Sequence, residues 1–300
     1  MSTFEDNASI KNSISSVISD YYQLTKPGIT IAVLASMLVG FVLGSGAEIN
    51  FAVMLHAIVG TYLIAAGTGA HNQFLERNYD GLMKRTAKRP LPDNRIDSTK
   101  GVIFSLTLIF AGLAYLILMV NPIAAGVSFA TTLIYLGIYT PLKRVSAFNI
   151  AIGAIPGALP PVGGWAAANG SIADPGMWLL FGIVFFWQIP HVMAIAWMCK
   201  DDYSGAGFFM VPKNDLNGTK TAFWSTLCLI LLIPITFMMY QFAGLSLIFL
   251  TLGMLFALIF LFYGIRFAMH RTKEHAKKLM FASIAYLPLV WIAVFVDLFF

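Results

Sequence analysis

The stretch that decides the fold is FAVMLHAIVGTYLIAAGTGAHNQFLERNYDGLMKRTAKRPL, residues 51–91. Its first part, Phe51–Leu75, is mainly apolar and long enough to cross a bilayer as a helix, which takes about 20 residues. Its second part places Asn72, Glu76 and Asp80 at intervals of four. Residues four apart lie on one face of a helix, so we expect these oxygen-bearing side chains to converge at the membrane end.

Two carboxylates and an amide suit a hard cation such as Mg²⁺, which binds oxygen and often shares its coordination with substrate phosphates. The next residues along the chain are cationic and can bind phosphate oxygens themselves. An ordinary solvated helix end is the alternative, but the spacing and the adjacent cations argue against it. The segment therefore predicts metal-assisted chemistry on a lipid-soluble phosphate ester. The cations are Lys84, Arg85, Lys88 and Arg89.

The composition is that of a membrane protein. Of the 300 residues 58% are hydrophobic and only 11% are charged, whereas a soluble domain has about 45–50% apolar and roughly 25% charged residues. We expect an all-α fold with nine transmembrane helices, in one domain over residues 29–300 that follows a cytoplasmic segment, residues 1–28. The nine apolar runs are Ile29–Ser45, Phe51–Leu75, Val102–Val120, Pro122–Tyr139, Phe148–Ala168, Met177–Met198, Ala222–Phe242, Leu245–Ile265 and Leu279–Val296.

The basic residues predict the orientation of these helices. All 19 Lys and Arg residues precede the first run or follow the second, fourth, sixth and eighth runs. The other loops and the C-terminal tail carry only acids, Glu48, Asp174 and Asp297. The positive-inside bias therefore predicts a cytoplasmic N-terminus and an external C-terminus. Because the positive charge belongs to short membrane loops, the net charge of +5 does not indicate nucleic-acid binding.

The N-terminal residues help to predict the location. Residues 1–20 are polar and mixed in charge, with neither the apolar core of a signal peptide nor the Arg-rich, acid-poor character of a transit peptide. We therefore expect direct insertion into a prokaryotic inner membrane, with the active site near its cytoplasmic face.

A second polar group follows the fourth run, where Tyr139, Lys143 and Arg144 lie close together. Lys143 and Arg144 can bind a diphosphate, Lys as a point charge and Arg as a fork. Tyr139 can donate to the bridging oxygen or stack on a developing cation. The alternative for the two basic residues is that they are ordinary positive-inside anchors.

A third group lies in the sixth run and at its cytoplasmic end. Gln188 and His191 are inside the run, and Asp201 and Asp202 follow it. A lone His in an apolar helix is commonly a satisfied core residue, and His191 could bond a carbonyl freed by Pro190. The shared direction of these residues favours a functional role. We expect one of the two acids, Asp202 with Asp201 as the alternative, to supply a second metal–diphosphate contact.

The fifth run is unusually rich in Gly and Pro over residues 153–165, GAIPGALPPVGGW. This density predicts an interrupted helix, which a membrane tolerates only where protein or a cavity satisfies the backbone. Two interpretations stay open: close helix packing through small residues, or a wall that makes room for a large flat substrate.

Together these motifs resemble the UbiA-type intramembrane prenyltransferases, which have nine helices and three such motifs in this order. The resemblance is closest to the haem-farnesylating branch of that family and covers Leu24 to about Pro212. Glu76 stands where the general pattern has Asp, and Met198 stands where many relatives have an acid, so the number of metal ions stays open. The residues that carry the resemblance are Leu24–Pro27, Met83–Leu91, Lys143 and Arg144 with Asn149 and Ile150, Pro160–Trp165, Trp187–His191 and Asp202–Gly207.

The resemblance implies an enzyme that needs Mg²⁺ and transfers farnesyl from farnesyl diphosphate to a vinyl group of haem B, with water added, to give haem O and diphosphate. It implies that Tyr139 and His191 join the catalytic set, with His191 on the haem side as an axial ligand or a propionate contact. The implied metal ligands are Asn72, Glu76, Asp80 and Asp202, and the implied diphosphate ligands are Arg85, Arg89, Lys143 and Arg144.

Two other functions stay open at this point. One is a prenyltransferase of the same fold that acts on an aromatic quinone precursor. The other is a transporter of an anionic lipid phosphate, which would not need the four-spaced acids. The partners that we expect are farnesyl diphosphate, haem B and the lipid bilayer, and a haem A synthase is a candidate partner.

Overall fold

A computed structural model describes residues 15–46, 48–212 and 214–299 of the chain. In these ranges nine helical segments are long and apolar enough to cross a membrane, so the expected all-α membrane fold is confirmed. The segments are α2 (Pro27–Gly44), α3 (Phe51–Asp80), α4 (Ser98–Met119), α5 with η1 and α6 (Pro122–Leu142), α7 (Asn149–Asn169), α8 (Pro175–Met198), α10 (Thr219–Phe242), α11 (Leu247–His270) and α12 (Lys273–Phe299).

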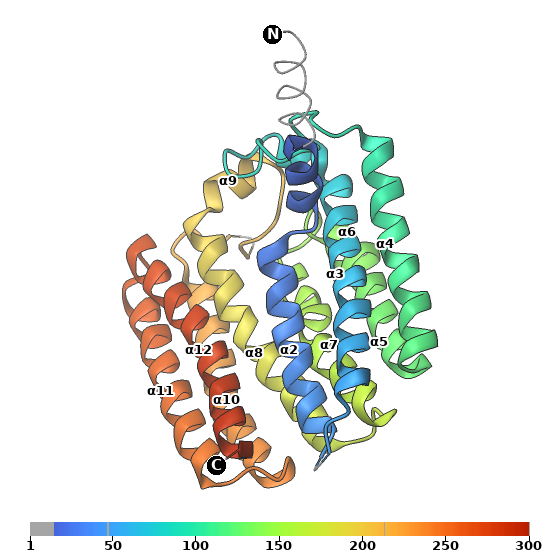
Figure 1. Ribbon diagram of the computed structural model, residues 1–300. Helices are drawn as coiled ribbons and strands as arrows, with labels where there is room; N and C mark the ends of the chain where they lie inside the picture. Colours follow the sequence, from blue (N-terminus) through green and yellow to red (C-terminus); the bar gives the residue numbers. More distant parts are fainter. Residues whose placement is uncertain (1–14, 47, 213, 300) are drawn as a thin grey trace, which may run out of the picture.

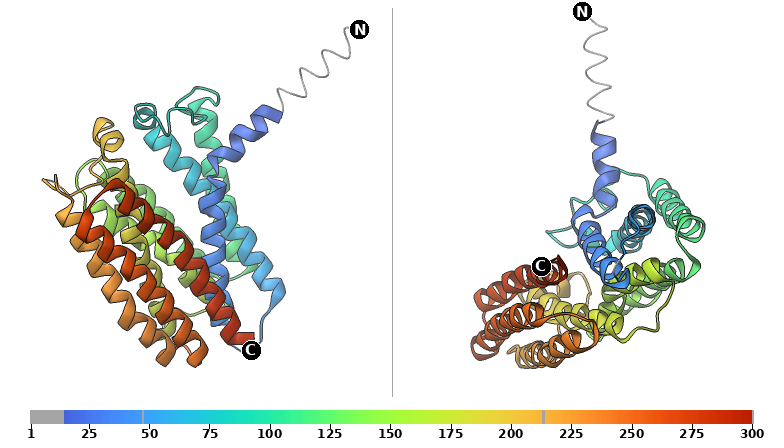
Figure 2. Two further views of the ribbon diagram at one scale, coloured as in Figure 1. Left: turned by 90° about the vertical axis from the view of Figure 1, so that its left-hand side faces the viewer. Right: turned by 60° about the horizontal axis from the view of Figure 1, so that its bottom comes forward.

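The helices form one bundle with its polar connections gathered at one end. Figure 1 shows α2 to α7 on one side, α10 to α12 on the other, and α8 between them. The α3–α4 loop, the short helix α9 (Lys200–Gly205) and the helical residues 15–24 lie at the same end, opposite the C-terminus (Figures 1 and 2). The α3–α4 loop and α9, which carry Arg85, Arg89 and Asp202, are therefore brought to one end of the bundle.

Side-chain caps fix where several helices begin. The side chain of Asn50 accepts from the backbone N–H of Val53 at the start of α3, and Asp97 does the same for two N–H groups of α4. Asp174 caps α8 in the same way. Such caps satisfy N–H groups that have no partner within the helix. The first turn of each of these three helices is thereby defined by local contacts.

The expectation that the fifth run is interrupted was wrong. Helix α7 is continuous from Asn149 to Asn169, although Pro156, Pro160 and Pro161 lie inside it. A proline removes one helical hydrogen bond, but neighbouring helices can hold such a segment in shape. Helix α7 is the most buried of the nine spans, and it packs extensively against α2 and α8. This enclosure keeps the backbone helical where sequence alone predicts a break.

Glycines let α7 approach α2 at backbone distance. A Cβ atom on Gly40 would lie 1.9 Å from the carbonyl oxygen of Pro161, and one on Gly164 would lie 1.9 Å from that of Met37. Any side chain at either position would force the helices apart. The Gly and Pro of the fifth run therefore serve close packing, one of the two interpretations left open above.

The fourth span contains a π-helical segment, η1 (Ile134–Tyr139), which the sequence pattern did not predict. A π segment inserts one residue into a helix and rotates the residues after it, and such segments are frequent at functional sites. Here the side chain of Thr140 donates a hydrogen bond of 2.8 Å to the carbonyl oxygen of Tyr135, which supports the altered backbone. The segment closely precedes Lys143, so it determines the direction in which that side chain leaves the helix.

The close contact of α2 and α7 makes a testable prediction about stability. Replacing Gly164 with Ala places a methyl group on the Met37 carbonyl, and overpacking of this kind costs about 1–3 kcal/mol. We expect Gly164→Ala to lower the Tm in detergent by several degrees. Gly126→Ala is the matched control, because nothing lies within 4 Å of a Cβ atom at that helical position. Equal Tm values for both variants would contradict this account of the packing.

Candidate active site

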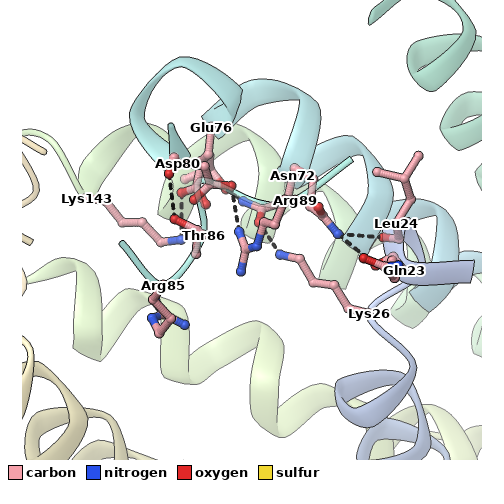
Figure 3. Close-up of polar contacts among 12 residues, drawn as sticks. Gln23, Leu24, Lys26, Asn72, Glu76, Asp80, Arg85, Thr86, Arg89 and Lys143 are labelled. Atoms are coloured by element: carbon pink, nitrogen blue, oxygen red, sulfur yellow. Dashed lines mark hydrogen bonds and ion pairs between the residues drawn. The ribbon is translucent and has the colours of Figure 1, made fainter. Parts of the chain in front are cut away.

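The three oxygen-bearing side chains at the end of α3 lie together and are buried. Asn72, Glu76 and Asp80 are 0%, 6% and 1% exposed. Helix α3 continues to Asp80, beyond the apolar run that ended at Leu75, so one helix face carries all three (Figure 3). The side chain of Thr86 donates to the carbonyl oxygen of Asp80 at 2.8 Å and fixes the chain where the helix ends.

Each of these side chains contacts a different cation, and the cations come from three separate segments. One precedes α2, one belongs to the α3–α4 loop and one follows α6 (Figure 3). Because charged groups are costly to bury alone, this pairing is what allows two carboxylates to lie inside the protein. The pairs are Lys26 Nζ with Asn72 Oδ1 at 2.5 Å, Lys143 Nζ with Glu76 Oε1 at 2.7 Å, and Arg89 Nη1 with Asp80 Oδ2 at 2.6 Å.

Asn72 is held from both ends of its amide. Its Nδ2 donates to the hydroxyl of Thr140 at 3.0 Å, and that hydroxyl donates onward to the carbonyl of Tyr135 in η1. The Oδ1 atom is therefore the end that faces Lys26. The π segment thus sets which atom of Asn72 faces the cations.

Lys26 belongs to the site, although no catalytic or binding role was predicted for it. It has the left-handed backbone angles φ 50° and ψ 60° at the start of α2. Such angles cost a non-glycine residue on the order of 1–3 kcal/mol and cluster at functional sites. Gln73 stabilises this turn by donating to the carbonyl oxygens of Gln23 and Leu24 at 3.0 and 3.1 Å. The sequence feature that could have pointed to Lys26 is its position directly before Pro27, at the start of the first membrane helix.

The two half-buried lysines differ in their electrostatics. Burial lowers the pKa of Lys26 to about 7, because the attraction of Glu76 does not compensate for desolvation and for the nearby Arg89 and Lys143. Burial also opposes the charge of Lys143, but Tyr139 and Glu76, which accepts a hydrogen bond from it, raise its pKa above the ordinary value. Lys143 is therefore a permanent cation, whereas the charge of Lys26 depends on what lies beside it.

The other predicted basic residues lie beside aromatic rings rather than on the carboxylates. Arg85 donates to the hydroxyl of Tyr203 at 3.2 Å and is exposed. The guanidinium carbon of Arg144 lies 4.3 Å from the ring centroid of Tyr79. Tyr139 lies under the ammonium group of Lys143 at 4.4 Å. The aromatic residues hold Arg85 and Arg144 without neutralising them, so these two cations retain the capacity to bind an anion.

The structure does not join the second acidic motif to the first. Asp201 is exposed and pairs with Lys273 at 3.2 Å, and Asp202 is half-buried on α9. Over the described ranges, no three His, Cys, Asp or Glu side chains are grouped so as to hold a metal ion. The donor set that does converge consists of the oxygens of Asn72, Glu76 and Asp80. Such a set fits Mg²⁺ when water or phosphate oxygens complete the shell.

An apolar cavity of about 440 Å³ opens beside this cluster. Its lining comes mainly from α2, α3, α5, η1, α7 and α8, and it includes Lys26 and Tyr139 at the polar end. Gly153, Pro156 and Gly157 of α7 line it as well, so the second interpretation of the fifth run, a wall beside a substrate space, agrees with the structure too. Gln188 also lines the cavity and donates to the carbonyl oxygen of Ala154 at 2.7 Å.

His191 also lines the cavity and has specific partners on both sides. Its Nδ1 lies 2.6 Å from the hydroxyl oxygen of Ser283 on α12. Its ring stacks on Trp187, with the centroids 5.4 Å apart and the planes at 16°. The indole N–H of Trp187 donates to the carbonyl oxygen of Ser283 at 2.7 Å. His191 is therefore held in one orientation at the wall of the cavity.

Comparisons with known proteins identify relatives of the chain. Residues 33–286 match the model of the UbiA prenyltransferase family. The protoheme IX farnesyltransferase of Solibacter usitatus is 40% identical over 281 residues, covering 91% of this chain and 96% of that protein. The protein of the same name from Christiangramia forsetii is 38% identical over 305 residues and covers 98% of each chain.

Solved structures agree in fold. A digeranylgeranylglyceryl phosphate synthase superposes with a TM-score of 0.78 at 16% identity, covering 93% of this chain and 98% of that one. A UbiA homologue from Archaeoglobus fulgidus bound to DMAPP and Mg²⁺ gives a TM-score of 0.64 at 13% identity, covering 92% and 99%. At these identities the likeness concerns the fold alone.

The converging oxygens lead to a prediction about ligand binding. Mg²⁺ and inorganic diphosphate added together should raise the Tm, because a ligand that binds only the folded state stabilises it. Glu76→Gln removes one charged oxygen and should weaken binding by about tenfold, since charge-assisted contacts are the strong ones. We expect a markedly smaller Tm shift, measured against each variant's own ligand-free value. Glu274→Gln, an exposed acid paired with Lys278, is the control, and an equal loss there would contradict the assignment.

Proposed function

The chain belongs to the UbiA prenyltransferase family, and we propose on that premise that it transfers a farnesyl group from farnesyl diphosphate to a vinyl group of haem B. The product is haem O, and the observation that carries this proposal is the set of buried oxygens and half-buried cations at the mouth of an apolar cavity. The acceptor follows from relatives described as protoheme IX farnesyltransferases.

The reaction needs a charge-stabilised leaving group and a dry place for a carbocation. The bond between C1 of farnesyl and the diphosphate oxygen breaks, and its electron pair leaves with the diphosphate. The terminal vinyl carbon of haem B bonds to C1, and water adds to the remaining carbon and releases a proton. Bound Mg²⁺ would supply charge neutralisation on the leaving diphosphate. Asn72, Glu76 and Asp80 are the residues that would hold it.

The cations of the site have a second task when the substrate binds. Lys143 and Arg89 exchange their carboxylate partners for diphosphate oxygens, and Lys26 joins them from the start of α2. Arg85 and Arg144, which lie on aromatic rings, meet the diphosphate at the mouth. Preorganised positive charge of this kind stabilises a leaving anion without rearrangement of water.

The second acidic motif contributes from α9. We assign Asp202 to contact with the metal-bound diphosphate, because α9 lies at the same end of the bundle as the C-terminal end of α3 (Figure 1). Asp201 is the less suitable of the two acids, since it is exposed and already paired with Lys273.

The cavity protects the allylic cation. Its walls are largely apolar, and exclusion of water prevents the cation from being quenched. The rings of Tyr139 and Tyr135 both line the cavity, with their centroids 5.2 Å apart and their planes tilted by 45°, so aromatic groups are available to the developing charge. His191 lines the same cavity and is assigned to the haem.

The basic loops support a location for this chemistry. The connections that carry Lys and Arg gather at the end of the bundle that holds the site (Figures 1 and 2). By the positive-inside bias we assign that end to the cytoplasmic face of a prokaryotic inner membrane, with the C-terminus outside. Residues 29–300 then form one membrane domain after a cytoplasmic segment, of which residues 1–14 lie outside the described ranges. A haem A synthase is a candidate partner.

An assay with three parallel reactions tests the function. Purified full-length protein in detergent is incubated with Mg²⁺ and labelled farnesyl diphosphate, and then with haem B, with a phenolic acid, or with neither. We expect label in haem O alone. Label on the phenolic acid would instead identify a quinone-precursor prenyltransferase. Absence of a covalent product with either acceptor would favour a lipid-phosphate transporter.

Asp80 provides a prediction about turnover. Asp80→Asn keeps the shape of the side chain but removes its charge, so the metal loses a ligand and kcat should fall by roughly 100-fold or more. Asp93→Asn is the control, because Asp93 is exposed in the following loop and its partner Arg95 also contacts Asp20. Normal turnover in a folded Asp80→Asn protein would remove the metal hypothesis.

Lys26 provides a prediction about substrate affinity. Hydrogen bonds to charged groups are worth about 1.5–3 kcal/mol, so Lys26→Met should raise the KM for farnesyl diphosphate by at least tenfold. Lys100→Met removes an exposed cation at the start of α4 and should leave the KM nearly unchanged. Lys26→Arg, which keeps the charge, should recover part of the affinity. An unchanged KM in Lys26→Met would exclude Lys26 from the diphosphate site.

A further inference from the structure

The hydrogen bonds around Ser283 define the protonation of His191. The hydroxyl of Ser283 lies 2.5 Å from the carbonyl oxygen of Met280 and 2.6 Å from Nδ1 of His191. A carbonyl oxygen can only accept, so the single hydroxyl proton of Ser283 is donated to Met280. The remaining contact then requires a proton on Nδ1, which is donated to the hydroxyl oxygen. The imidazole is therefore the Nδ1–H tautomer, and Nε2 carries the lone pair.

The rest of the environment holds this ring in place. Ser283 is fully buried, and its carbonyl oxygen accepts the indole N–H of Trp187, whose ring stacks on His191. One residue of α12 thus fixes both Trp187 and His191 of α8. No hydrogen bond to Nε2 is found among the described residues, and His191 lines the cavity together with Leu287, one turn after Ser283 on α12.

A neutral imidazole with a free Nε2 has specific chemistry. It can bind iron as an axial ligand, and metal-binding histidines usually donate their other ring nitrogen to an oxygen that fixes the tautomer. The same nitrogen cannot donate a hydrogen bond to a haem propionate, because it carries no proton. The tautomer therefore separates the two roles that the sequence left open for His191.

We propose that Ser283 is a positioning residue that holds His191 in the Nδ1–H form, so that Nε2 binds the iron of the haem substrate. This inference rests on the proposed function, and it deepens it by assigning the haem side of the cavity to α8 and α12. Helix α12 lies outside the stretch that carries the sequence motifs, so its part in the acceptor site is visible only in the folded molecule.

Haem titration of the full-length protein, without farnesyl diphosphate, tests the proposal. We expect wild-type protein with ferric haem B to show the optical and EPR spectra of histidine ligation. His191→Ala should lose that ligation, and added imidazole should restore it. Ser283→Ala should bind haem about tenfold more weakly and give a mixture of ligation states, whereas Ser283→Thr, which keeps the hydroxyl, should resemble the wild type.

Two controls separate positioning from a general loss of structure. Ser225→Ala removes another fully buried serine hydroxyl, on α10, and should leave the haem spectrum unchanged. Ser283→Cys retains the size of the side chain but offers a poorer hydrogen-bond acceptor, so we expect the same spectrum as for Ser283→Ala. It takes the place of Ser283→Ala if the alanine variant does not fold. The Tm of every variant is measured alongside.

Each outcome decides the proposal. A wild-type spectrum and affinity in folded Ser283→Ala or Ser283→Cys would overturn the positioning role, and a wild-type spectrum in His191→Ala would overturn the ligand assignment. Absence of haem binding by the wild-type protein would overturn both. A failure of the proposed function would give a different result. Haem would be ligated by His191, but no haem O would form when Mg²⁺ and farnesyl diphosphate are added.

Discussion

Two carboxylates buried at the end of a membrane helix need positive charge beside them, and this requirement organises the polar end of the bundle. Uncompensated charges cost several kcal/mol when they leave water. Glu76 is paired with Lys143 at 2.7 Å, and Asp80 is paired with Arg89 at 2.6 Å. These cations come from two different loops, so neutralising α3 also fixes the loops around it. Lys26 adds a third connection, from the start of α2 to Asn72.

In the proposed reaction, the same ion pairs would respond to the substrate. Magnesium can replace the Lys and Arg side chains as the partner of the carboxylates, and the diphosphate can replace the carboxylates as the partner of the Lys and Arg side chains. Partner exchange of this kind avoids leaving any charge buried alone at an intermediate stage. Lys26 is the member most sensitive to its surroundings, since its partner is a neutral amide and burial lowers its pKa. A diphosphate would give Lys26 the counter-charge that Asn72 does not provide.

Local patterns in the sequence predicted the parts of this account that depend on one helix or one loop. The nine spans follow from apolar length, and the shared face of Asn72, Glu76 and Asp80 follows from their spacing. Lys143 and Arg89 were predicted to bind the diphosphate because of the sequence motifs in which they lie. The structure pairs them with the carboxylates of Glu76 and Asp80, so their role in binding the diphosphate stays a prediction. Asp202 was expected beside the first motif, and the described structure does not bring it there.

The features that sequence analysis missed depend on distant contacts. Lys26 meets Asn72 across 46 positions of the chain, and His191 meets Ser283 across 92. The continuity of α7 likewise depends on enclosure by its neighbours, which outweighs the local effect of its prolines. The π segment η1 has no clear signature in its own residues, yet it determines how Asn72 and Lys143 face the site.

A structure of the full-length protein with Mg²⁺ and a non-reactive thio analogue of farnesyl diphosphate tests the central claim most directly. The account predicts that Glu76 and Asp80 bind magnesium, while the Lys143 and Arg89 side chains have moved onto diphosphate oxygens. A diphosphate bound elsewhere, or ion pairs that persist unchanged with the analogue in place, would contradict it.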